Sequence, residues 1–156
     1  MSDISSLKDT INTKTLNLVL LTIATAGIYP LLWLYRNQTI ISDVTKSKVT
    51  NDIFIIWIAV CAGLGGVFSN VDEDLFLMLS GILSIASTVL YIVWAFKAKK
   101  ALQNYALNEF RFELKMNVFY TILFNVYYIN YCINDLPEAL RKQQILNEKT
   151  TGQANC

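Results

Sequence analysis

The chain has 156 residues, of which 54% are hydrophobic and 16% are charged, and its formal net charge is +1. A soluble domain carries about 25% charged residues, so this composition indicates a membrane protein. The small net charge argues against nucleic acid as a partner. Histidine is absent, which excludes imidazole catalysis and histidine-ligated metal sites. We expect one helical membrane domain over residues 1–149 and a disordered tail over residues 150–156.

Four stretches without a charged residue divide the chain. These apolar windows cover residues 15–35, 53–71, 75–96 and 116–134. Each is close to the roughly 20 residues that a helix needs to cross ~30 Å of hydrocarbon. A soluble helical bundle would instead carry charges along every helix. The windows therefore predict an all-α, multi-pass integral membrane protein with four hydrophobic segments.

The positions of Lys and Arg orient the second and third windows. The link between these two windows, residues 72–74, contains three acidic residues and no Lys or Arg, whereas both neighbouring links contain several. The positive-inside rule places Lys- and Arg-rich links in the cytoplasm. We therefore predict two central spanning helices that form a hairpin with its acidic tip outside. Residues 97–115 are expected to form an amphipathic cytoplasmic helix that leaves the bilayer and lies along it.

The first and last windows allow two interpretations. If both span the membrane, both termini lie outside and 8 of the 13 Lys and Arg residues are cytoplasmic; if both are re-entrant, all 13 are cytoplasmic. Gly27 and Pro30 are candidates for a helix break in the first window, because glycine loosens the backbone and proline removes a hydrogen bond. We favour re-entrant segments, with plain spanning helices as the alternative.

The two outer windows also share a weak internal pattern. Residues 27–37 can be laid over residues 125–135, which matches Tyr29 with Tyr127, an aromatic residue at the seventh place, and a polar exit. Pairs of interrupted segments in two halves occur in transporters. Aromatic-rich ends of membrane segments also produce such a match by chance, so the pattern leaves internal duplication open.

A motif in the first window resembles a known family. The run TAGIY at residues 25–29, followed by Trp33, Tyr35 and Arg36, is similar to the signature of the bacterial membrane family known as domain of unknown function 4234. The aromatic, asparagine-containing end of the last window is similar to the last segment of that family. The resemblance implies an inner-membrane protein of the bacterial cell envelope, and it implies no reaction or cofactor. Pro30 departs from the small residue expected at its place.

Small and hydroxyl residues mark the central pair of windows as tightly packed. Small side chains four residues apart let helix backbones approach closely. The helix-packing candidates are Ala59, Gly63, Gly66, Ser80 and Ser84. The predicted contact is either the hairpin itself or an interface between protomers.

The last window is the most polar of the four. Its candidate stripe consists of Asn125, Tyr127, Asn130, Tyr131 and Asn134. An asparagine amide costs several kcal/mol in lipid unless it is hydrogen-bonded, so these side chains must face protein, water or the headgroup layer. The simpler interpretation is polar contact between helices. The alternative is a polar cleft or oligomer axis that admits a lipid headgroup or a small solute.

These patterns favour binding over catalysis. No carboxylate or amine lies inside a window, so the usual groups for intramembrane catalysis or proton transfer are missing, and we expect no catalytic residues, cofactor or metal. The leading hypothesis is a non-enzymatic homo-oligomer, such as a trimer, with a structural role in the envelope through lipid or protein binding. The alternative is a small channel or facilitator with an Asn/Tyr-lined pathway.

Overall fold

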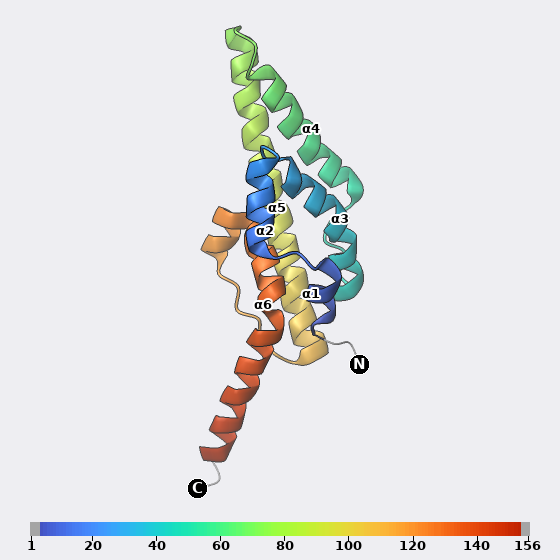
Figure 1. Cartoon of the computed structure of the whole chain (residues 1–156), viewed down its shortest axis with the longest axis vertical. Coiled ribbons are helices and arrows are strands. Elements are labelled where there is room, and N and C mark those ends of the chain that lie inside the picture. Colours follow the sequence, from blue (N-terminus) through green and yellow to red (C-terminus); the bar gives the residue numbers. More distant parts are fainter. Residues whose placement is uncertain (1–3, 154–156) are drawn as a thin grey trace.

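The computed structural model describes residues 4–153, and within that range the chain is all-helical (Figure 1). This confirms the all-α part of the predicted fold class. The helices are α1 (Ser6–Ile11), α2 (Thr15–Ala24), α3 (Ile28–Thr45), α4 (Asp52–Phe68), α5 (Asp74–Phe110) and α6 (Val118–Gln153). Among them, α5 alone is long and apolar enough to cross a membrane, while α4 is apolar but shorter. Four spanning segments were expected. By length and composition, α5 is the one helix of the described residues that meets the requirement.

The first window does not form one helix. It forms α2 and the start of α3, which run in opposite directions on either side of a turn at residues 25–27 (Figure 1). Gly27 lies at the turn with φ 89°, a value that glycine adopts without steric cost. Pro30 is the third residue of α3, where the missing N–H would have no helical partner. Gly27 therefore lies at the break, and Pro30 continues the new helix.

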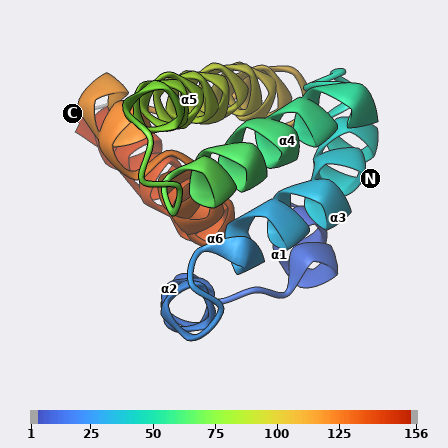
Figure 2. The same cartoon turned by 90° about the horizontal axis from the view of Figure 1, so that it is seen from above.

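Helices α4 and α5 lie side by side and run antiparallel, as Figures 1 and 2 both show. Their joint end extends beyond the rest of the molecule. The 37 residues of α5 contain both the third window and most of the expected cytoplasmic helix. That expectation is corrected, because α5 continues without a break to Phe110 and its lower third is buried among other helices.

The last window is also divided. Helix α6 is interrupted at Asn125, whose φ of 32° and ψ of −105° are not helical. The chain reaches the short limb of α6, residues 118–124, through an extended segment that climbs back along the molecule, and the long limb descends from Asn125 (Figure 1). Pro137 lies inside the long limb. Helix α6 extends to Gln153, and residues 154–156 of the expected tail lie outside the described residues.

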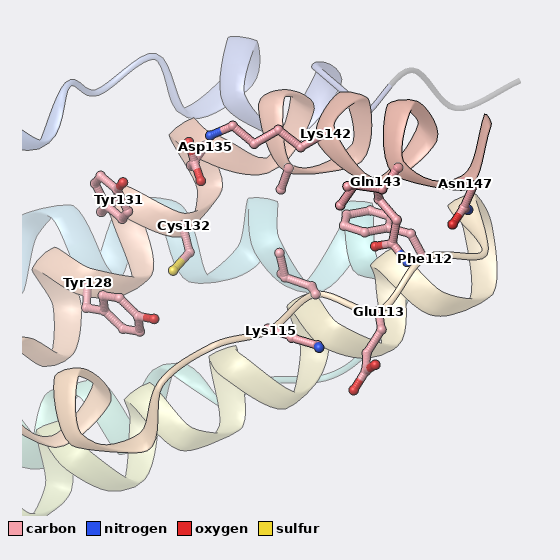
Figure 3. Close-up of a pocket in the computed structure, with 13 residues that line it drawn as sticks. Phe112, Glu113, Lys115, Tyr128, Tyr131, Cys132, Asp135, Lys142, Gln143 and Asn147 are labelled. Atoms are coloured by element: carbon pink, nitrogen blue, oxygen red, sulfur yellow. The ribbon is translucent and has the colours of Figure 1, made fainter. Parts of the chain in front are cut away.

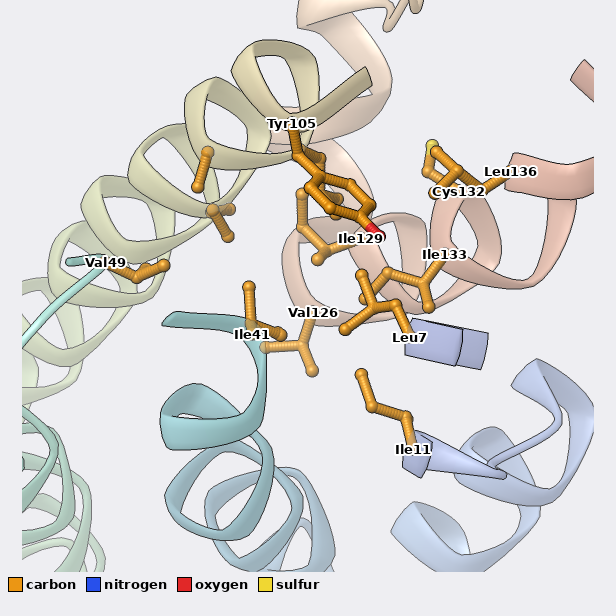
Figure 4. Close-up of a cluster of buried hydrophobic side chains, with 14 of the residues drawn as sticks. Leu7, Ile11, Ile41, Val49, Tyr105, Val126, Ile129, Cys132, Ile133 and Leu136 are labelled. Carbon is orange, nitrogen blue, oxygen red and sulfur yellow. The ribbon is translucent and has the colours of Figure 1, made fainter. Parts of the chain in front are cut away.

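The core gathers around the lower part of α5. Small and aromatic side chains of α5 are buried there against α1, α3 and the long limb of α6 (Figure 4). Trp94 of α5 is fully buried and meets Trp33 of α3 edge to face, with 6.3 Å between ring centroids. The upper parts of α4 and α5, by contrast, expose large hydrophobic residues along most of their length. In the core, the alanines of α5 let the neighbouring helices approach its backbone closely, because alanine side chains are short.

Candidate functional site

The two helix breaks meet beside α5. Gly27 and Pro30 of the first break, Tyr91 of α5, and Asn125 and Tyr127 of the second break line one cavity of about 200 Å³. The Tyr127 hydroxyl donates a hydrogen bond of 3.0 Å to Thr22 Oγ1 on α2. The two predicted break residues are thus brought together with two members of the polar stripe.

The two remaining asparagines of the stripe bind the chain at the start of α2. Asn130 Nδ2 donates to the Thr13 carbonyl (3.0 Å) and to Thr15 Oγ1 (3.2 Å). Asn134 Nδ2 donates to the same Thr13 carbonyl at 2.9 Å. Asn130 is completely buried, and no hydrogen-bond partner for its Oδ1 is found among the described residues. The amides therefore fasten the first segment to the last.

Tyr131 differs from its neighbours in the stripe. Its side chain is 53% exposed, and its ring stacks on Tyr128, with centroids 6.5 Å apart and planes inclined by 12°. The Tyr128 hydroxyl accepts a hydrogen bond of 2.9 Å from the backbone N–H of Asn117. Neither tyrosine takes part in the amide contacts with Thr13 and Thr15.

The helix-packing candidates fall on two different faces. Ser80 Oγ donates a hydrogen bond of 2.8 Å to the carbonyl of Gly65, and a Cβ added to Gly65 would lie 3.3 Å from Ser84 Oγ. Ser80 and Ser84 therefore lie at the α4–α5 contact, and the glycine opposite them is Gly65. Ala59, Gly63 and Gly66 are exposed on the other side of α4. The reason is helical geometry, since residues 63 and 65 lie about 200° apart around a helix.

An apolar groove runs between α2 and α6. Val19, Thr22 and Ile23 form its α2 side, while Phe124, Tyr127 and the pair Tyr128 and Tyr131 form its α6 side. Its volume is about 530 Å³. Thr22 and Tyr127 line both this groove and the cavity between the breaks. The groove opens sideways, onto the apolar surface of the molecule.

A charged pocket of about 550 Å³ adjoins the groove at Tyr128 and Tyr131, and Figure 3 shows this pocket. It is formed between the extended segment after α5 and the long limb of α6. Alternation along that segment buries Phe112, Leu114 and Met116 and exposes the residues between them, as expected for extended chain. The charged residues of the pocket are Glu113, Lys115, Asp135 and Lys142. Tyr128 and Tyr131 line both the pocket and the groove.

Sequence reasoning did not single out this pocket, although a signal for it was present. Lys115 and Asp135 are the charged residues that bracket the last window. If that window turns back on itself, its two ends must lie on the same side of the molecule. Residues from both ends then meet, as they do here.

The long limb of α6 contains an ion pair between two of its own residues. Lys142 Nζ lies 2.8 Å from Glu138 Oε1, one turn earlier on α6. This contact holds the pKa of the Glu138 carboxyl below its ordinary value and raises the pKa of Lys142. Within residues 4–153, no three His, Cys, Asp or Glu side chains are grouped closely enough to hold a metal ion. Amides, hydroxyls and paired charges suit ligand binding.

Comparison with known proteins places the chain in a family. A family model described as domain of unknown function (DUF4234) matches residues 13–104. The match includes the first break, α4 and most of α5, and it ends before the last window, so the resemblance suggested for that window lies outside it. Neither the curated proteins nor the solved structures give a match. The chain belongs to the DUF4234 family.

Proposed function

We propose that this protein is a non-enzymatic, multi-pass protein of the bacterial inner membrane with a structural role in the envelope, exerted through lipid binding. The observation that carries this proposal is the exposed apolar surface. Large hydrophobic side chains are exposed on α2, on α4, on the upper part of α5 and on residues 118–124. In the most apolar stretch of α5, only 11% of residues are buried. Contiguous apolar surface of this extent fits a lipid environment.

The lengths of the segments fit two crossings and two re-entrant turns. Helix α2 has 10 residues, so it rises about 15 Å, half of a hydrocarbon layer of ~30 Å. The first break thus falls near mid-depth, and the second break lies beside it. The third window gives α5 a full crossing, and α4 with the turn after it accounts for the other. Broken helices are tolerated at this depth where they are packed in protein.

Self-association fits the exposed small-residue face of α4. A Cβ added at Gly63 or Gly66 would meet nothing within 4 Å, so this face is free to receive a helix from a second copy. We propose a small homo-oligomer joined through Ala59, Gly63 and Gly66. Native mass spectrometry of Gly63→Leu should show monomer, whereas Gly81→Leu, an exposed glycine on α5, should keep the oligomer. Equal behaviour of the two variants would contradict this interface.

The channel alternative has weaker support. A pathway lined by the Asn/Tyr stripe requires free amides, but Asn130 and Asn134 both donate to Thr13. Purified full-length protein reconstituted into liposomes should therefore leave them tight to small ions. Permeability that disappears with Asn130→Leu and persists with Asn104→Leu, an exposed asparagine on α5, would favour a channel instead.

Membrane integration itself has a direct test. After expression in bacteria, the full chain should remain in the membrane pellet through an alkaline carbonate wash, because two crossings bury far more apolar area than a peripheral contact. Release of the chain into the wash would contradict the proposed function.

A further inference from the structure

The groove between α2 and α6 and the charged pocket that adjoins it form one continuous surface. Tyr128 and Tyr131 line both, and Figure 3 shows the two rings at one end of the pocket. Apolar walls therefore pass into charged walls within one site, and two tyrosines mark the boundary. Tyrosine is enriched where hydrocarbon meets headgroups, because its ring is apolar and its hydroxyl is polar.

The pocket carries charges of both signs. Glu113 and Asp135 supply two carboxylates, and Lys115 and Lys142 supply two amines. Lys142 is already paired with Glu138. In the described part of the chain, Glu113, Lys115 and Asp135 have no ion-pair partner within 4.0 Å. Unpaired charges of both signs at the membrane edge are complementary to a headgroup that carries both signs.

We propose that this site binds one glycerophospholipid with a zwitterionic, amine-bearing headgroup, such as a phosphoethanolamine lipid. One acyl chain lies in the groove against Val19 and Phe124. The phosphate contacts Lys115, and the headgroup amine contacts Asp135 and Glu113. The groove opens onto exposed apolar surface, where Ile23 is 74% exposed, so the ligand enters sideways from the bilayer. This inference rests on the proposed membrane placement and adds the class of lipid.

The choice of lipid follows from these charges. A purely anionic headgroup, such as phosphoglycerol, would place its phosphate near Lys115 but leave two carboxylates without a partner. One exposed ion pair changes affinity by at most about fivefold. We therefore expect phosphatidylethanolamine to bind about two- to fivefold more tightly than phosphatidylglycerol with the same acyl chains.

The test is native mass spectrometry of the full chain in mild detergent, titrated with the two lipids in turn. One phosphatidylethanolamine per chain should be retained. Lys115→Glu should reduce binding, whereas Lys100→Glu, an exposed lysine of α5 outside the pocket, should not. Equal retention of both lipids, or equal loss in the two variants, would overturn the headgroup assignment.

The groove is tested separately. Val19→Trp fills it and should block lipid retention, whereas Leu20→Trp, on the adjacent exposed position of α2, should leave retention unchanged. Glycerophosphoethanolamine, which has the headgroup and no acyl chains, should not displace the lipid; displacement at equal concentration would overturn the role of the groove. If lipid selectivity fails while the chain resists the carbonate wash, this inference falls and the proposed function stands.

Discussion

The two helix breaks have similar shapes but different sequence origins. At the first break, Gly27 has a positive φ of 89°, and Thr25 Oγ1 accepts a hydrogen bond of 2.9 Å from the backbone N–H of Tyr29. At the second break the positive φ belongs to Asn125, and the window contains no glycine or proline. Gly27 supplies part of the first turn locally, and Ala26 beside it also has a positive φ, of 49°. The second turn depends on Asn125, one of the few residue types that tolerate positive φ, and on tertiary contacts such as Tyr127 with Thr22.

The largest expected loss of stability comes from the contact between α3, which follows the first break, and α5. Trp94→Ala removes a fully buried ring that meets Trp33 at 6.3 Å. We expect the free energy of unfolding to fall by about 3–5 kcal/mol, as for other buried aromatic truncations. Thermal unfolding of the purified protein in detergent measures it. Trp57→Ala, a tryptophan that is 58% exposed, is the control and should change stability little.

The second largest loss of stability is expected at the contact that joins the first and last segments. Asn130→Leu removes the donor to Thr13 and Thr15 and leaves the Thr13 carbonyl, on a half-buried residue, with one partner fewer. The expected loss is about 1–3 kcal/mol, measured by the same unfolding experiment. Asn104→Leu makes the same change at an exposed position of α5. If both variants unfold alike, the amide does not hold the segments together.

Substitutions at Gly27 test whether the first break requires a glycine or accepts the asparagine found at the second break. Gly27→Ala introduces a Cβ at φ 89°, where nothing lies within 4 Å, so backbone strain alone should cost about 1–2 kcal/mol. Gly27→Asn should cost less, because asparagine already occupies the positive φ of the second break. Gly81→Ala, at an open helical position, is expected to stabilise by about 0.5–1 kcal/mol. A neutral Gly27→Ala would mean that glycine is not required at the turn.

The smallest effect concerns the long limb beyond the second break. Lys142 holds the pKa of the Glu138 carboxyl below its ordinary value, so the pair contributes stability above the ordinary carboxyl pKa and loses it as pH falls through the lowered one. Carbon-13 NMR titration of Glu138 in micelles should show the lowered pKa. Lys142→Met should restore it to the ordinary range, and an unchanged titration would exclude the pair.

Much of the helical architecture could be predicted from the distribution of charge. The absence of charges from four windows led to the all-α fold class, and Gly27 led to the first break. The position of Asn125 as the second break was not predicted, because an asparagine in an apolar window fits polar packing as well as a turn. Single-sequence patterns did not resolve these two outcomes.

The contacts of the candidate site could be predicted only in part. The spacing of Tyr127, Asn130 and Asn134 placed them on one face, but their hydrogen-bond partners on or just before α2 lie more than 100 residues away. The burial of the lower third of α5 was missed for a related reason. Residues 97–115 were expected to lie along the membrane surface, whereas Ala98 and Leu102 pack into the core, which depends on helices that are distant in sequence.

Cysteine accessibility tests the central claim, that both outer segments turn back so that both termini share the cytoplasmic side. A Cys61→Ser, Cys132→Ala chain leaves Cys156 as the single thiol, and a second chain with Cys156→Ser and Asp72→Cys places the thiol at the acidic tip. In cells with an intact inner membrane, an impermeant maleimide should label the tip and should reach Cys156 only after lysis. Labelling of Cys156 before lysis would mean that the last segment crosses the membrane and would contradict the account.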